Sequence, residues 1–293
     1  MKKIYILILL IVFSCSNDNE NDETSNCINN QTPLSTNINI TRILVYGSNQ
    51  TSLLREYVIE NNRITESRGG VVSLYNNCWF DYNYNSCGQL ISIKCQNDGL
   101  LRTKLSYDTS GRLKTYRVGY NGGFTLKFEY TQNNTVIINE FRGYNEVNDS
   151  HASLNSSREW LFDNNENMIT SIIENAEFEY SYSNQNFITS TDNENILNYH
   201  PEKNPFFLIF TNTYGRKNNF LINYGFDSIT YSNPFTLIEE LGLSNNLISS
   251  WENSSSGNLI RYTEILETSN GYVTEYREIS DGEVSKLIVV EYQ

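Results

Sequence analysis

Apolar and polar residues alternate along much of the chain. In residues 124–130 (FTLKFEY), aromatic and aliphatic side chains take every second position, with Thr, Lys and Glu between them. Residues 177–183 (EFEYSYS) follow the same pattern. Because successive side chains of a β-strand point to opposite faces of the sheet, this period of two predicts antiparallel strands with one buried and one solvated face.

A turn-like unit recurs between the alternating segments. Its first three copies start 23 residues apart, and each has an aromatic residue first, Gly or Asn fifth and an aliphatic residue seventh. The fifth place is where a hairpin with a one-residue bulge needs a positive φ, which Gly and Asn adopt at little cost. The copies are residues 84–90 (YNSCGQL), 107–113 (YDTSGRL) and 130–136 (YTQNNTV), with a further match at 162–168 (FDNNENM) and weaker ones at 58–64 (VIENNRI) and 267–273 (ETSNGYV).

Composition and repeat length together predict an all-β fold. The chain holds 21 Tyr and 14 Phe, residue types that fit a pleated and half-buried surface. A period of 23 residues suits one hairpin plus its return turn, which implies strands numbering roughly in the teens, too many for one flat sheet. We therefore expect antiparallel hairpins rolled into a barrel-like or an elongated curved sheet.

One segment has the pattern of a helix instead. Asn233 is a candidate N-cap, Pro234 suits the first helical position and Gly242 suits the stop. The aliphatic residues at positions 237, 238 and 241 fall on one helical face. These signals predict a single short helix near 234–241 that plugs an end of the sheet or covers one of its edges.

The N-terminus predicts export and a lipid anchor. Lys2 and Lys3 precede an unbroken apolar run at residues 4–13, which is too short to span a bilayer and is typical of a signal peptide, here residues 1–14. The run ends in VFSC, which resembles the lipobox of bacterial lipoproteins and implies acylation of Cys15. The alternative is an ordinary secretory signal with an incidental cysteine.

Residues 15–36 are expected to form a lipidated, flexible tether. The segment that follows Cys15, SNDNENDETSN, is polar and acidic and cannot contribute to a core. It resembles the acidic export signal that sends Bacteroidetes lipoproteins to the outer face of the outer membrane, which implies exposure to the cell exterior. A plain spacer, with the domain on the periplasmic side, is the alternative. Residues 37–293 then form a single repeat-built β domain.

The repeats carry a family resemblance. The unit YDTSGRL resembles the YD (RHS-type) repeat, and the order of segments 233–247, 254–262 and 270–276 resembles the C-terminal part of a family of Bacteroidetes outer-membrane and surface lipoproteins. The resemblance covers the chain from about Ile40 onward. It implies an all-β, barrel-like fold and a surface address, and it implies no particular activity.

Charge and cysteine usage narrow the partners and the compartment. A net charge of −13 argues against nucleic acid as a partner, since its binders need a basic surface. Apart from Cys15 there are four cysteines, Cys27, Cys78, Cys87 and Cys95, and an even number in an exported protein predicts two disulfides.

The repeat serves as a ruler for the disulfide pairing. If residues 84–90 turn as residues 107–113 do, the numbers of any two residues that face each other across the hairpin add up to 174. Trp79 then lies opposite Cys95. One more residue in the turn changes this sum to 173, and Cys78 then lies directly across from Cys95, at a distance that a disulfide can span. Cys87, at the turn, would then bond Cys27. We hypothesise the pairs Cys78–Cys95 and Cys27–Cys87, although Cys87 takes the place of Ser110 in the next repeat, which favours the 174 register.

Catalytic and metal signals are sparse. His151 and His200 lie in polar, turn-like contexts, which is typical of loop histidines, and no GxSxG elbow is present. Asp163, Asn165 and Asn167, followed by Glu174, resemble half of a calcium loop, but Met replaces the required glycine and the same residues form a repeat turn. We therefore predict no metal site and no cofactor.

The aromatic residues leave two function hypotheses. Exposed tryptophan rings stack on sugars, which makes Trp79, Trp160 and Trp251 candidates for ligand stacking, whereas the alternative is that these rings fill the core. The first hypothesis is a non-enzymatic surface lipoprotein, attached to the membrane by its lipid, that binds a glycan, a peptide or a partner outer-membrane protein. The second is an extracellular polysaccharide hydrolase with a carboxylate pair, for which no Asp or Glu stands out.

Overall fold

The structure is a computed structural model and describes residues 39–69, 78–119, 123–142, 153–173, 176–190, 195–222, 242–253 and 259–293. The predicted signal peptide, the tether, Cys15 and Cys27 lie outside these ranges. The described part contains 18 strands. They are β1 (Ile40–Tyr46), β2 (Leu53–Glu60), β3 (Arg63–Gly69), β4 (Trp79–Tyr84), β5 (Leu90–Cys95), β6 (Leu101–Tyr107), β7 (Leu113–Val118), β8 (Phe124–Tyr130), β9 (Thr135–Arg142), β10 (Ser153–Phe162), β11 (Met168–Ile173), β12 (Ala176–Ser183), β13 (Asn186–Ser190), β14 (Asn195–Lys203), β15 (Asn246–Asn253), β16 (Leu259–Ser269), β17 (Tyr272–Ser280) and β18 (Glu283–Tyr292).

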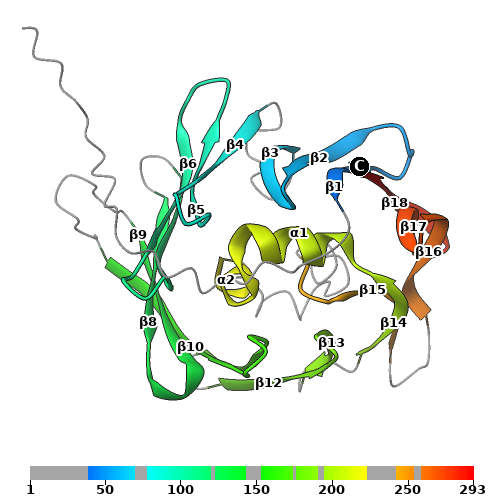
Figure 1. The fold of residues 1–293 in the computed structure, drawn as a ribbon. Helices are drawn as coiled ribbons and strands as arrows, with labels where there is room; N and C mark the ends of the chain where they lie inside the picture. The colour runs from blue at the N-terminus through cyan, green and yellow to red at the C-terminus, as the bar shows by residue number, and fades with distance from the viewer. Residues whose placement is uncertain are drawn as a thin grey trace, which may run out of the picture.

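The strands form one antiparallel sheet that curls into a nearly closed barrel (Figure 1). Consecutive strands pair from β1 to β13 and again from β14 to β18. Strand β1 also pairs with β18, with Ile43 opposite Val290, and this contact brings the two ends of the sheet together. The expected all-β, barrel-like architecture is confirmed.

Two helices lie inside the ring of strands (Figure 1). They are α1 (Pro205–Tyr214) and α2 (Arg216–Ile222), and every residue of α1 from 205 to 213 is buried. We call the two helices the plug. Tyr57 of β2 packs edge-on against Phe206 and Phe210 of α1, with ring centroids 6.0 and 5.8 Å apart. Neither plug helix is long and apolar enough to cross a membrane.

The plug was not predicted, although its start carries a recognisable signal. The side chain of Asn204 caps the helix by accepting a hydrogen bond from the backbone N–H of Phe206 at 2.9 Å, and Pro205 occupies the first helical position. After α1, the backbone N–H of Gly215 donates to the carbonyl of Thr211 at 2.8 Å, with Gly215 at a φ of 85°. The helix that the sequence does predict, near 234–241, lies outside the described residues.

Inward-facing side chains form the core between barrel wall and plug. One apolar cluster holds Trp160, Phe162 and Phe220, and a second holds Tyr57, Phe206 and Val290. Large apolar residues that are exposed among the described ones lie singly, at Leu54, Leu154 and Leu266. These apolar side chains fill the space between wall and plug, as the alternating pattern predicts, while polar residues such as Thr125 and Glu140 are buried on the strands too.

The repeat turns adopt the predicted geometry. The fifth residue has positive φ in all four units: 73° at Gly88, 75° at Gly111, 60° at Asn134 and 62° at Glu166. Glu166 is unusual there, because a side chain other than Asn or Asp rarely enters this region.

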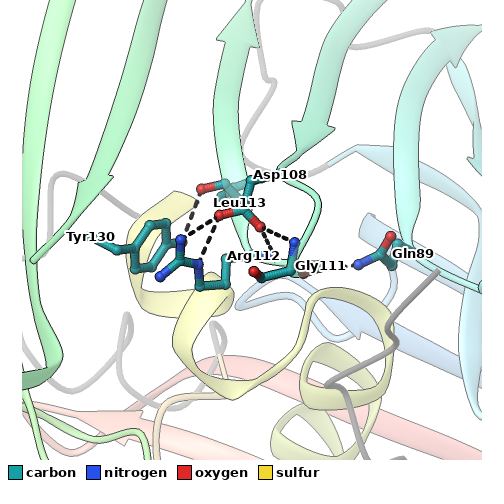
Figure 2. Close-up of polar contacts among 7 residues, drawn as sticks. Gln89, Asp108, Gly111, Arg112, Leu113 and Tyr130 are labelled. Carbon is teal, nitrogen blue, oxygen red and sulfur yellow. Dashed lines mark hydrogen bonds and ion pairs between the residues drawn. The ribbon is translucent and has the colours of Figure 1, made fainter. Parts of the chain in front are cut away.

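The second residue of the turn also stabilises it, a role that the repeat pattern alone does not indicate. Asp108 Oδ1 accepts hydrogen bonds from the backbone N–H groups of Ser110 and Arg112, both at 2.9 Å. Figure 2 shows the Arg112 side chain turned back onto the Asp108 carboxylate and lying over the Tyr130 ring. An Asx residue that satisfies the turn's own N–H groups favours the turn conformation before the strands pair.

Tyrosine hydroxyls connect each turn unit to the one before it. Tyr107 Oη donates to the carbonyl of Leu90 at 2.8 Å, and Tyr130 Oη donates to the carbonyl of Leu113 at 2.9 Å. In both cases the first residue of one unit bonds the last residue of the preceding unit. The weaker match at 58–64 obeys the same rule, because Tyr84 Oη donates to the carbonyl of Ile64 at 2.6 Å. We call these three contacts the tyrosine ladder, which ends at the fourth unit because Phe162 has no hydroxyl. Tyr292, which starts no unit, makes a similar bond to the carbonyl of Val273 at 2.8 Å.

The disulfide Cys78–Cys95 is present, with Cα atoms 5.8 Å apart, but the register that was used to predict it is wrong. Tyr84 pairs with Leu90, as the 174 register requires, and an extra residue in β5 then shifts the pairing so that Phe80 lies opposite Cys95. Cys78 is two residues before Phe80, so it reaches Cys95 diagonally on the same face of the sheet. Cys87 is disulfide-bonded too, and its predicted partner Cys27 lies outside the described residues.

Candidate functional site

The three tryptophans occupy different environments. Trp160 is fully buried in the wall and Trp251 is 7% exposed, so both rings belong to the core. Trp79 on β4 is partly exposed, and the guanidinium of Arg68 lies 5.2 Å from its ring centroid. Among the three predicted stacking residues, Trp79 alone presents ring surface to solvent, and a cation already covers part of it.

The candidate calcium turn is satisfied by its own backbone. Asp163 Oδ1 accepts from the backbone N–H groups of Asn165 and Asn167, both at 2.8 Å, and Oδ2 accepts from Asn167 Nδ2 at 2.8 Å. Glu174 lies outside the described residues. Within the described ranges, no group of three or more His, Cys, Asp or Glu side chains is placed to hold a metal ion.

Of the two histidines, His200 lies within the described residues, and its ring contacts the barrel wall. His200 Nε2 lies 3.1 Å from the carbonyl oxygen of Thr263, and its Nδ1 lies 4.0 Å from Glu202 Oε2. His151 lies outside the described residues. His200 is thus engaged with the barrel wall.

Buried carboxylates in the barrel wall face cations. Glu56 is 2% exposed and contacts Arg42 and Arg68, the latter at 3.2 Å. Glu278 is 1% exposed and lies 3.6 Å from Lys286. A buried carboxylate is stable when a cation is near it, which explains these residues as parts of the wall.

The structure contains a cleft at the end of the barrel where β18 meets β1. It encloses a volume of about 310 Å³. Strands β17 and β18 pair with Glu275 opposite Val289, and continuing this register brings residues 272 and 274 beside residues 292 and 290 on one face. Figure 1 shows the C-terminal end of β18 next to β1. The lining residues are Asn39, Ser269, Asn270, Tyr272, Thr274, Val290, Tyr292 and Gln293.

Two aromatic rings form one side of the cleft. The ring centroids of Tyr272 and Tyr292 are 6.1 Å apart and their planes are tilted by 37°. The hydroxyl of Tyr292 is held by its bond to the carbonyl of Val273, so the orientation of this ring is fixed. Burial raises the pKa of Tyr292 further above neutral pH.

Polar groups complete the lining. Thr274 Oγ1 is buried and has no hydrogen-bond partner among the described residues. At the rim, Asn39 Nδ2 donates to Gln293 Oε1 at 3.1 Å, which leaves other amide donors and acceptors on both side chains. Convergent polar groups around an apolar wall are typical of a small-molecule site.

Sequence reasoning did not find the cleft. The repeat-like match at 267–273 marks the turn at its mouth, and it gives the positive φ of Asn270 (53°) and Gly271 (83°). Tyr292 lies 20 residues beyond Tyr272, and Asn39 precedes β1. Tyr272 and Tyr292 come together through the β17–β18 hairpin, whereas Asn39 reaches the cleft because β1 pairs with β18, and no local pattern indicates that second pairing.

The fold and its cleft define the chain as an all-β, nearly closed barrel with a helical plug and a neutral cleft at one end. No protein-family model and no curated protein matches the chain. Among solved structures, it is similar to a porin-like protein from Bacteroides vulgatus ATCC 8482, at 12% identity and a TM-score of 0.38, over 87% of this chain and 99% of that one.

Two further structures are similar. A porin-like protein from Bacteroides uniformis ATCC 8492 matches at 13% identity and a TM-score of 0.37, over 87% of this chain and 98% of that one. A structure described as TcdB2-TccC3 matches at 11% identity and a TM-score of 0.19, over 80% of this chain and 11% of that one. The lipoprotein resemblance and the YD-type assignment of the repeats stay predictions.

Proposed function

We propose that this protein is a lipid-anchored component of the outer membrane, facing the cell exterior, whose barrel domain binds a ligand and catalyses no reaction. The proposed location rests on the sequence: Cys15 follows the apolar run at residues 4–13, and an acidic segment follows Cys15. The binding function rests on the cleft.

The cleft carries the proposal because of where it lies. The plug helices and the inward-facing wall residues pack into the core, whereas the cleft opens at the end of the barrel. Its lining consists of rings, hydroxyls, amides and one aliphatic side chain, and these groups hold a ligand by contact and hydrogen bonding. A hydrolase with two carboxylates would instead place a pair of Asp or Glu side chains across such a cleft.

The anchor is tested with the full-length chain in a bacterial host. Wild-type protein is expected in the membrane fraction with a mass increased by lipid, and Cys15→Ala or globomycin treatment is expected to abolish both. Protease added to intact cells should remove the domain if it faces outward. A Cys15→Ala variant that still partitions with membranes at unchanged mass would contradict the anchor.

The binding function is tested on the same full-length protein. We expect saturable binding to at least one member of a panel of defined glycans and peptides, with no release of reducing ends from polysaccharides. Release of reducing ends that depends on a carboxylate of this chain would show that the protein is a hydrolase and would refute the proposal.

A further inference from the structure

We propose that the cleft is a subsite for a neutral sugar ring, with Tyr272 and Tyr292 as the stacking face and Thr274 as a buried hydrogen-bond acceptor. The inference rests on the proposed binding function and names the ligand class for it. It moves the stacking role away from the tryptophans, two of which are buried in the core.

The lining selects for a neutral ligand. It contains no Asp, Glu, Lys or Arg, and its polar members are Asn39, Ser269, Asn270, Thr274 and Gln293. A charged ligand would lose hydration on entering and would meet no opposite charge from the side chains of these eight residues, which makes its binding costly. A neutral polyol avoids that cost, because hydroxyls exchange hydrogen bonds with water for bonds with amides and hydroxyls.

The aromatic pair suits the flat faces of a sugar. Tyrosine is a large, rigid contact surface with few rotatable bonds, so little conformational entropy is lost when a ring packs on it. The hydrogen bond between Tyr292 and Val273 fixes one ring in advance, and the Tyr272 ring lies beside it with its plane tilted by 37°. A site that is ordered before binding avoids part of the entropic cost of association.

Thr274 supplies the specific polar contact. Buried polar atoms nearly always have a partner, and an exception calls for an explanation. Thr274 Oγ1 is such an exception in the part of the chain that the structure describes, and it lies in the cleft wall. Rotation of the Thr274 side chain about χ1 brings this oxygen to a ligand hydroxyl in the cleft. The volume of about 310 Å³ is at the lower end of the range for small-molecule sites and accommodates on the order of one or two sugar rings.

The test is calorimetric titration of the full-length protein with neutral oligosaccharides of glucose, galactose, mannose and N-acetylglucosamine. We expect one series to bind, Tyr272→Ala to weaken it by about tenfold or more, and Thr274→Val to weaken it by about fivefold. Tyr272→Phe, which keeps the ring, should bind within about threefold of wild type. The matched control is Tyr46→Ala, at the far end of β1 from Asn39, which should leave affinity unchanged.

Each outcome of the titration supports or refutes one of the two proposals. Thermal melting of every variant separates loss of the site from loss of the fold, and Thr274→Val keeps the side-chain shape if Tyr272→Ala does not fold. Binding that survives Tyr272→Ala and Thr274→Val refutes the cleft assignment and leaves the binding function intact. Binding only to anionic glycans or to peptides refutes the neutral-sugar inference alone, whereas binding to no glycan and no peptide refutes both proposals.

Discussion

Arg216 Nη2 donates a hydrogen bond to Asn167 Oδ1 across 2.8 Å, and this contact joins the plug to the barrel wall. Arg216 begins α2, and Asn167 is the sixth residue of the fourth repeat turn. The guanidinium carbon lies 4.7 Å from the ring centroid of Phe207 and 4.9 Å from that of Phe220. Burial lowers the pKa of Arg216 to about 10, so the group is still a cation at neutral pH.

Arg216→Ala is expected to destabilise the protein by about 3 kcal/mol or more, because it removes a buried hydrogen-bonded cation and leaves Asn167 Oδ1 without this donor. The measurement is urea unfolding followed by circular dichroism. The matched control is Arg112→Ala, since Arg112 is exposed in the second repeat turn and should cost about 1 kcal/mol at most. Equal losses for the two variants would show that Arg216 does not join plug and wall.

Buried tyrosines predict loss of stability at alkaline pH. Burial against α1 raises the pKa of Tyr57 from 10.0 to about 12, and burial raises the pKa of Tyr107 and Tyr182 as well. Above pH 10 the unfolded chain loses these protons while the folded chain keeps them. The contribution of Tyr57 to the free energy of unfolding is therefore fully present below pH 10 and is lost as pH rises through about 12.

The check combines phenolate absorbance with circular dichroism during an alkaline titration. We expect the phenolate signal of the buried tyrosines to appear together with unfolding, and Tyr57→Phe to reduce the slope of unfolding free energy against pH in that window. A phenolate signal that is complete while the barrel is still folded would contradict this prediction.

Glu166→Asn is expected to stabilise the protein by about 0.5 to 1 kcal/mol. Glu166 has a φ of 62°, a conformation that Asn adopts more readily than Glu does. The 3.3 Å contact from the Lys217 backbone N–H to Glu166 Oε2 is long for a hydrogen bond and offsets little of this gain. The reverse change at the matching position, Asn134→Glu, should destabilise by a similar amount. Thermal melting that gives the two variants the same sign would refute the strain argument.

Tyr107→Phe is expected to cost about 1 kcal/mol by removing one contact of the tyrosine ladder while keeping the ring. The carbonyl of Leu90 then loses the side-chain donor that reaches it from the next unit. Tyr46→Phe is the control, and we expect no measurable change from it. The comparison is made by urea unfolding, and an unchanged midpoint for Tyr107→Phe would mean that water replaces the hydroxyl without loss.

The disulfide prediction is checked by non-reducing peptide mapping. We expect a Cys78–Cys95 peptide, and we predict a Cys27–Cys87 peptide beside it. Replacing Cys78 and Cys95 together by Ser should cost about 3 kcal/mol, because their bond closes a loop with a sequence separation of 17. A peptide joining Cys78 to Cys87 would contradict both pairings.

Local chemistry explains what the sequence predicts well. The positive φ at Gly88 and Asn134 follows from residue type at a fixed place in a turn. The burial of Leu126 and Phe128 follows from alternation along residues 124–130, although Thr125 on the other face is buried as well. Both depend on neighbours within a few positions. The class of fold, antiparallel and rolled up, follows from repeating such units.

The plug helix and the register of β5 could not be predicted, because the residues near them are compatible with more than one structure. The run PFFLIF at residues 205–210 is apolar throughout, so its periodicity fits a buried strand and a buried helix equally. The pair Asn204–Pro205 carries the same start signal as Asn233–Pro234 and would have resolved it. The extra residue in β5 moves Cys95 opposite Phe80. The same shift follows the turns at 107–113 and 162–168, so it belongs to the repeat unit, but the residue types of the turn do not indicate it.

The end of the tyrosine ladder at Phe162 sets an order in which the barrel should open. Where the ladder stops, α2 takes its place, with Lys217 Nζ 4.6 Å from the Phe162 ring centroid and Phe220 6.2 Å from it. Strands β3 to β8 thus have the tyrosine ladder in addition to their backbone pairing, whereas β10 to β13 have backbone pairing and packing on the plug. Amide hydrogens of β10 to β13 should therefore exchange with solvent before those of β5 to β8. A wall built from one repeated unit would then contain two parts that open separately.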